Sequence, residues 1–260
     1  MSLDDTLIKA FHAHRAAGDL FHSGAGEAHE MFQTSTINAV LESVYDGDVT
    51  FAELARHGDF GVGTFNALDG EMTALDGQFF QARSDGRLYP AKPEMRTPFA
   101  VMIPFDPTLS VEIEERTDFA TLLQALDKAV PSKNLFYAVR VDGRFSHIKV
   151  RAVPRQKKPY RPLVEVTAHQ PEFAFHDIGG SLVGFRFPDY TVGINVPGYH
   201  VHFVSDDRSV GGHVLDFTME RGRVEIDVTS QFHMALPQES AFLQADLAKD
   251  SAEDIRKAEK

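Results

Sequence analysis

Two histidines that alternate with apolar residues constrain the fold of this chain more than any other feature. The segment Gly198-Tyr-His-Val-His-Phe203 has the period-2 pattern of a strand that turns one face toward a core. A polar stretch, Ser205 to Arg208, separates it from Gly211-Gly212-His213. The pattern predicts a β-hairpin whose first strand carries His200 and His202 on the same face.

The loop length of this hairpin decides where His213 points. An even-length loop centred on Asp206-Asp207 would pair His213 with His200 and Gly211 with His202, so that the three histidines share one face. An odd-length loop would turn His213 away unless a bulge at Gly211-Gly212 restored it.

Three neutral imidazoles are typical of catalytic zinc, because they leave a coordination position open. Imidazole also suits other transition metals, so zinc is favoured on ligand type and availability. We therefore predict a metal site, with Zn²⁺ as cofactor, at His200, His202 and His213. The alternative interpretation is that these are ordinary strand histidines, hydrogen-bonded to their neighbours.

Composition narrows the chemistry further. The 260-residue chain has no cysteine, which excludes disulfides, thiolate nucleophiles and cysteine-ligated zinc. Its formal charge of −12 argues against nucleic acid or an anionic membrane as a partner. If the substrate is an anion, the positive charge must therefore be local, from an arginine, a metal or both.

No apolar run approaches the roughly 18 residues needed to cross a bilayer. The first residues also lack the basic and apolar regions of a signal peptide. We expect a cytoplasmic protein, and export with removal of a leader stays an open alternative.

The remaining pattern mixes helices and strands. Apolar periodicity and capping residues predict helices over 35–44, 50–57 and 117–130. Short apolar runs at 79–80, 99–105, 135–141 and 145–153 predict strands, with Asp-Gly turns at 76–77, 85–86 and 142–143. From about residue 165 to 237 the chain reads as strand and turn, and two short helices follow at 239–248 and 252–258.

This order predicts an α/β (α+β) fold with two domains. Residues 1–170 would form an N-terminal α/β domain, with helices on a mixed sheet. Residues 171–260 would form a β-barrel-like domain that carries the metal site and a helical tail.

Several long motifs resemble those of the alpha-acetolactate decarboxylase family. They are G-F-R-F-P-D-Y (184–190), G-I-N-V-P-G-Y-H-V-H-F (193–203), G-G-H-V-L-D-F (211–217), Y-D-G-D-V-T-F-A-E-L (45–54) and G-x-G-T-F-N-A-L-D-G-E-M (61–72). The resemblance runs from about Phe32 to the C-terminal helix. It implies conversion of 2-acetolactate to (R)-acetoin and CO₂, with zinc on the three histidines. It also implies a C-terminal β-barrel and a homodimer.

The same resemblance adds four site residues: Glu71, Thr64, Arg151 and Glu259. Taken alone, Glu71 reads as a solvated turn carboxylate and Arg151 as part of a basic edge strand. Glu259 reads as a residue of a frayed chain end, with Glu253 as a competitor for its role.

In the mechanism that these residues suggest, the metal is a Lewis acid that stabilises the enolate left by loss of CO₂. Arg151 would hold the oxygens or the carboxylate of the substrate. Glu71 or Glu259 would deliver the proton that makes acetoin chiral.

Two other classes of protein share part of this pattern. A cupin-like metal oxygenase also places H-x-H on a barrel strand, but it usually adds a glutamate a few residues later, which Ser205 to Arg208 do not offer. A non-enzymatic β-rich module with a structural metal would need a fourth protein ligand, such as Asp216 or His233.

Overall fold

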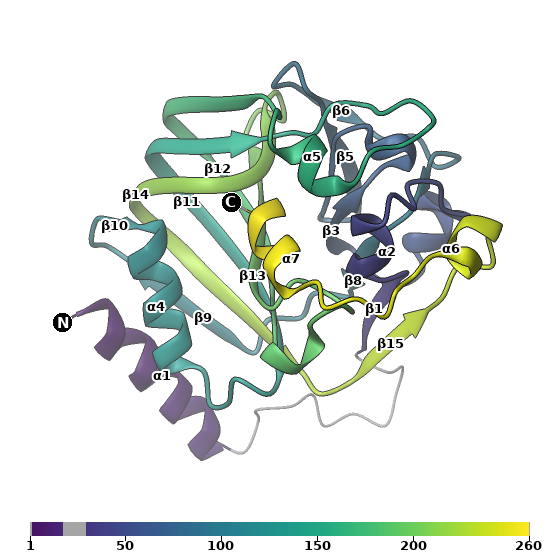
Figure 1. Cartoon of the computed structure of the whole chain (residues 1–260). Coiled ribbons are helices and arrows are strands. Elements are labelled where there is room, and N and C mark those ends of the chain that lie inside the picture. The colour runs from purple at the N-terminus through teal and green to yellow at the C-terminus, as the bar shows by residue number, and fades with distance from the viewer. Residues whose placement is uncertain (1, 18–29, 260) are drawn as a thin grey trace.

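The computed structural model describes residues 2–17 and 30–259, and most of its strands belong to two sheets that lie side by side (Figure 1). The first sheet has the order β15-β1-β8-β3-β4-β5-β6 among the described residues. Its strands are β1 Met31–Thr34, β3 Phe60–Thr64, β4 Glu71–Leu75, β5 Gln78–Ala82, β6 Leu88–Pro90, β8 Ala100–Ile103 and β15 Phe232–Ala235. Neighbouring strands are antiparallel, except that β15 pairs in parallel with β1.

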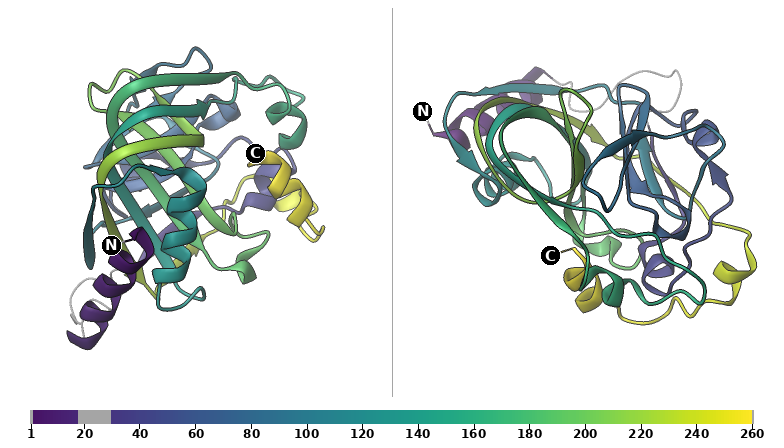
Figure 2. Two further views of the ribbon diagram at one scale, coloured as in Figure 1. Left: turned by 90° about the vertical axis from the view of Figure 1, so that its left-hand side faces the viewer. Right: turned by 90° about the horizontal axis from the view of Figure 1, so that it is seen from above.

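The second sheet contains the longest strands and closes on itself. Its strands are β9 Leu109–Ile113, β10 Thr117–Asp118, β11 Phe136–Arg151, β12 Glu172–Phe187, β13 Gly198–Ser205 and β14 Gly211–Thr229. Because β13 pairs with both β12 and β14, the path β14-β11-β12-β13 returns to β14. Seen from above, these strands curl around a common centre (Figure 2). A separate short pair joins β2 Val49–Thr50 to β7 Arg96–Thr97.

The predicted helices form where their capping residues occur. Thr36 accepts a hydrogen bond from the Ala39 backbone at the start of α2 Ile37–Leu41. Thr50 and Glu53 form a capping box on α3 Phe51–Leu54, and Asp118 caps α4 Phe119–Ala129. The other helical segments are α1 Leu3–Ala17, α5 Leu163–Thr167, α6 Ser240–Gln244, α7 Ala252–Ala258, and two 3₁₀ turns, η1 Asn66–Leu68 and η2 Asp189–Thr191. Among the described residues, the helices are all too short or too polar to cross a membrane.

The predicted turn at Asp142-Gly143 is wrong, because these residues lie inside the continuous strand β11. Gly143 pairs with Gly180 of β12 on one side and with Gly222 of β14 on the other. A Cβ on Gly143 would lie 2.7 Å from the Met219 Sδ atom, so glycine permits the close approach of strands here. An Asp-Gly pair is a local signal for a turn, and pairing with a strand on each side overrides it.

Side chains of β13 alternate between two cores. Val201 and Phe203 pack on one side with apolar residues of α4 and β9. His200 and His202 point the other way, on the same face as Val183 and Phe185 of β12, which pack against the first sheet. The histidines therefore face the space between the two sheets.

The predicted mixed α/β fold with a β-rich C-terminal part is confirmed. The division into domains at residue 170 stays a prediction, and the two sheets do not follow it. Strands β9, β10 and β11 precede residue 170 but belong to the second sheet, whereas β15 follows it and belongs to the first.

Candidate metal centre and active site

The three predicted metal-ligating histidines converge. His200 and His202 come from β13 and His213 from β14, and all three are buried. One ring nitrogen of each lies within 4.8 Å of one nitrogen of each of the others. The shared face is as predicted, but the register is not: His213 pairs with His202, and Gly211 with Val204. The turn is centred one residue later than predicted, so each pairing partner shifts by two residues, and a shift by two preserves the face.

Backbone of the first sheet orients His202. Its Nδ1 atom lies 2.8 Å from the Met72 carbonyl oxygen of β4. A carbonyl can only accept, so Nδ1 carries the proton and Nε2 keeps its lone pair. That Nε2 atom lies 3.1 Å from Nε2 of His200. A carbonyl partner on the far ring nitrogen is the usual support of a metal-ligating histidine.

Burial keeps these histidines neutral. It lowers the pKa of His200 from 6.5 to about 3, and the positive charge of Arg151 acts in the same direction. Burial also holds the pKa of His202 and of His213 well below the ordinary value. Neutral imidazoles with converging nitrogens are the donor set that a transition-metal cation requires, so the residues present fit such an ion.

A buried carboxylate, Glu71, and a partly buried one, Glu259, lie beside the histidines. Glu71 begins β4, and its Oε2 atom is 3.9 Å from Nε2 of His202. Glu259 follows α7, and its Oε2 atom is 3.6 Å from Nε2 of His213. The two carboxylates are 188 residues apart in the sequence, and the fold brings both to one site.

Desolvation dominates the acidity of both carboxyl groups. Burial raises the pKa of Glu71 from 4.5 to about 7, the Arg151 charge opposes this rise, and the charge of Glu259 adds to it. Burial likewise raises the pKa of Glu259, again against Arg151. Carboxyl groups whose pKa lies closer to neutrality can both hold and release a proton near physiological pH.

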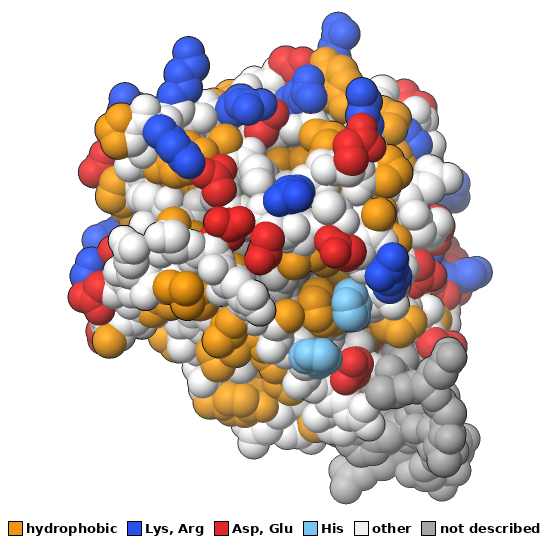
Figure 3. Space-filling model, turned by 90° about the vertical axis from the view of Figure 1, so that its right-hand side faces the viewer, with side chains coloured by type: hydrophobic (Ala, Val, Ile, Leu, Met, Phe, Trp, Pro, Cys, Tyr) orange, Lys and Arg blue, Asp and Glu red, His pale blue; other side chains and the backbone are white. Residues whose placement is uncertain are grey.

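Arg151 ends β11 directly opposite His213 and is 3% exposed. Its Nη1 atom donates to the Gln170 side-chain oxygen at 2.6 Å, and its Nε atom has no hydrogen-bond partner. On the face of the molecule shown in Figure 3, acidic and basic side chains are interspersed, so positive charge on that face is balanced by nearby negative charge. Within the site, Arg151 is the cation that an anionic ligand would meet.

The fourth residue suggested by the family resemblance, Thr64, lies at the end of β3 and is 7% exposed. Its hydroxyl donates to the Gly70 carbonyl oxygen at 2.8 Å. The proton of this hydroxyl is already used in that bond, but its oxygen can still accept a hydrogen bond from a ligand.

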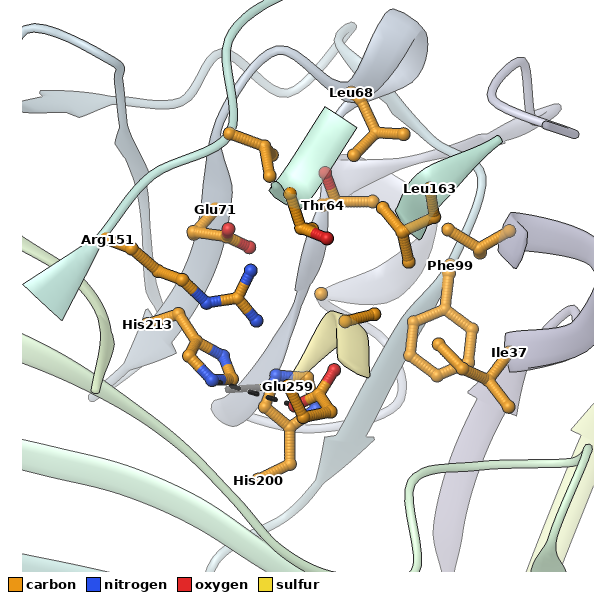
Figure 4. Close-up of a pocket in the computed structure, with 15 residues that line it drawn as sticks. Ile37, Thr64, Leu68, Glu71, Phe99, Arg151, Leu163, His200, His213 and Glu259 are labelled. Carbon is orange, nitrogen blue, oxygen red and sulfur yellow. Dashed lines mark ion pairs between the residues drawn. The ribbon is translucent and has the colours of Figure 1, made fainter. Parts of the chain in front are cut away.

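These polar groups line one side of a pocket between the sheets (Figure 4). Glu71, Arg151, His200, His213 and Glu259 converge on that side. The labelled apolar residues Ile37, Leu68, Phe99 and Leu163 lie on the opposite side (Figure 4), and Val40 and Val153 also line the pocket. A small molecule with a charged end and methyl groups fits such a division.

Sequence reasoning missed this apolar wall and Gln170. Phe99 and Leu163 lie in runs that look like ordinary core, and nothing in the sequence distinguishes a residue facing a pocket from one packed against a neighbour. Gln170 lies in no motif that we recognised. Its role depends on a contact across 19 residues, and sequence spacing carries no signal for that contact.

A structural metal site needs a fourth protein ligand, and neither predicted candidate, Asp216 or His233, belongs to the histidine group. Asp216 is exposed, and the Nδ1 atom of His233 lies 3.3 Å from a Glu30 carboxylate oxygen on the surface. In the part of the chain that the structure describes, the metal-competent group has three members. This favours an open coordination position over a closed structural site.

Comparisons with known proteins agree with one another. The family model of alpha-acetolactate decarboxylase matches residues 31–249, which include every predicted site residue except Glu259. An alpha-acetolactate decarboxylase of Methylococcus capsulatus is 60% identical over 259 residues, with 100% of both chains covered. One from Klebsiella aerogenes is 48% identical over 217 residues, 84% of each chain. The crystal structure of the Bacillus subtilis strain 168 enzyme superimposes with a TM-score of 0.87 at 40% identity, covering 88% of this chain and 99% of that one.

Proposed function

Because this chain is a carboxy-lyase of the alpha-acetolactate decarboxylase family, we propose that it converts 2-acetolactate to (R)-acetoin and CO₂ in the pocket between the two sheets. One observation carries the proposal. Three neutral histidines converge, and two of them, His200 and His213, line a small pocket that has an apolar wall. The buried Arg151 and the carboxyl groups of Glu71 and Glu259 line the same pocket.

The reaction needs an acceptor for an electron pair. When the C–C bond to the carboxylate breaks, two electrons stay on the carbon next to the ketone, and they delocalise onto the ketone oxygen. We propose that His200, His202 and His213 hold a divalent cation, zinc by ligand type, which supplies the Lewis acidity that stabilises this charge.

The protein side chains account for binding and orientation. The Arg151 guanidinium has an Nε–H group without a hydrogen-bond partner, and we propose that this cation holds the substrate carboxylate. The Thr64 oxygen can accept a hydrogen bond from the substrate hydroxyl. The methyl groups of acetolactate would lie against apolar residues such as Phe99 and Leu163.

A proton must then reach that same carbon from one side to give a single enantiomer. Glu71 and Glu259 are the candidates, since burial raises the pKa of both above the ordinary value for glutamate. Glu71, with a pKa of about 7, can be protonated in a fraction of the molecules at neutral pH, and the pKa of Glu259 is raised in the same direction. The proposal leaves the choice between them to experiment.

The test combines metal analysis with an acetoin assay on racemic acetolactate. We expect His202→Ala to lose both bound metal and activity, and Glu71→Gln to keep the metal and lose turnover. His176→Ala is the matched control, because His176 is exposed on β12 and does not line the pocket. Full activity in a chelator-treated, metal-free preparation would refute the metal-dependent scheme, and the absence of acetoin would refute the substrate.

Two further expectations accompany this function. We propose that the enzyme is a homodimer, as the family resemblance implies, and that it acts in the cytoplasm. Sedimentation equilibrium of the purified protein and fractionation of cells measure these two properties directly.

A further inference from the structure

The partner of the buried Arg151 is unusual for an arginine. A guanidinium that is 97% buried is normally paired with a carboxylate, because an unpaired charge in a dry interior is costly. In the part of the chain that the structure describes, Arg151 forms no ion pair within 4.0 Å, and its side-chain partner is the neutral amide of Gln170. The Nε donor is left without a partner.

Charged and titratable groups do surround the guanidinium, but they are not matched to it. Glu71 and Glu259 are close enough for Arg151 to lower their pKa values, yet burial raises both more strongly. His200 and His213 also feel its charge, and both are neutral. Because no ion pair within 4.0 Å holds the guanidinium in the described part of the chain, its positive charge stays available to a ligand.

The backbone holds Gln170 firmly beside Arg151. Gln170 follows α5, and its N–H donates to the Thr167 carbonyl. The next residue, Pro171, accepts a hydrogen bond from the N–H of Ala152, which follows Arg151. Arg151 itself pairs with Glu172 at the start of β12. The two side chains thus project from segments that are fixed to each other.

We propose that Gln170 is a positioning residue for substrate binding. Its amide oxygen fixes the orientation of the Arg151 guanidinium without neutralising it, so that the charge and the free N–H groups stay available for the substrate carboxylate. The identity of that carboxylate rests on the proposed function. A carboxylate at position 170 would make a stronger hydrogen bond but would compete with the substrate for the charge.

Two variants distinguish the effect of holding the Arg151 guanidinium in place from the effect of neutralising its charge. Gln170→Glu keeps an acceptor oxygen and adds a negative charge, whereas Gln170→Met keeps the volume and removes the acceptor. Gln244→Glu in α6 is the matched control, because it makes the same chemical change at an exposed position. For each protein we would measure KM and kcat for acetolactate, the Kd of 2-hydroxy-2-methylpropanoate by calorimetry, and Tm.

For Gln170→Glu we expect Tm to be unchanged or higher, while KM and the Kd of the hydroxy acid rise by roughly 10- to 100-fold, as loss of a charged hydrogen bond implies. For Gln170→Met we expect kcat/KM to fall by about tenfold, because the guanidinium is no longer held in place. Gln244→Glu should behave as the unmodified protein.

A purely structural Gln170 would give the opposite pattern, since Gln170→Glu would strengthen the contact and leave KM and Kd unchanged. KM and Kd within twofold of the unmodified values would therefore overturn the proposal. An unmodified protein that makes no acetoin would instead contradict the proposed function. The calorimetric Kd would still report on Gln170 in that case.

Discussion

Replacing Glu71 with glutamine should make the metal-free protein more stable at alkaline pH, even though Glu71 lies in the proposed active site. Glu71 is 8% exposed, and burial raises the pKa of its carboxyl group from 4.5 to about 7. Below pH 4.5 the group is protonated in both the folded and the unfolded chain, so it makes no difference to stability. Above about pH 7 the folded protein must hold a carboxylate that the site disfavours.

The size of this effect follows from the two pKa values. At about 1.4 kcal/mol for each tenfold change, the difference between 4.5 and about 7 corresponds to roughly 3 kcal/mol. Because the folded-state pKa is raised, stability is lost as pH rises through this window. Glutamine has a similar shape and no charge, so Glu71→Gln should avoid the loss.

The assay is urea unfolding of both proteins at about pH 5 and about pH 8 in the presence of a chelator, because a bound cation would stabilise the carboxylate. We expect the free energy of unfolding of Glu71→Gln to exceed that of the unmodified protein by up to about 3 kcal/mol at the higher pH. The difference should fall to about 1 kcal/mol or less at the lower pH. Glu94→Gln is the control, because Glu94 is exposed. An equal difference at both pH values would refute the argument from desolvation.

Two further predictions concern the segments that hold the site together. The Asn38 amide donates to the Leu247 carbonyl at 3.1 Å and accepts from the Ser251 hydroxyl, and so ties the C-terminal tail to α2. We expect Asn38→Ala to cost about 1–3 kcal/mol, to speed proteolysis of the tail and to lower kcat by displacing Glu259; an unchanged cleavage rate would contradict this. A Cβ on Gly180 would lie 2.3 Å from the Phe203 ring, so Gly180→Ala should lower the free energy of unfolding by roughly 1–3 kcal/mol. An unchanged midpoint in urea would show that β12 and β13 can separate without cost.

The histidine hairpin shows how far local pattern extends. Side chains in a strand alternate with a period of two, so His200 and His202 share a face in any register. A loop of any even length brings His213 to that face. The observed pairing is shifted by two residues, which changes the partner of His213 from His200 to His202 and keeps the face. Helix starts at Thr36, Thr50 and Asp118 were predictable for the same reason, since a cap involves residues three apart.

The turn predicted at Asp142-Gly143 marks the limit of such reasoning. Its backbone conformation is decided by hydrogen bonds to β12 and β14, which lie about 40 and 80 residues further along the chain. The local preference of Asp-Gly for a turn is of the order of 1 kcal/mol, and the backbone hydrogen bonds that β11 makes to strands on both sides outweigh it.

From its own residues the sequence determined three converging imidazoles, the absence of thiolate chemistry, and an acidic protein in which any positive charge must be local. The family resemblance then supplied Glu71, Arg151 and Glu259, which the tertiary structure placed around the histidines. Only the packing of the two sheets decided that the β4 carbonyl of Met72 orients His202, that desolvation raises the pKa of Glu71, and that Gln170 holds Arg151. Each of these depends on contacts between distant segments, and burial and electrostatic strength exist only once those segments have excluded water.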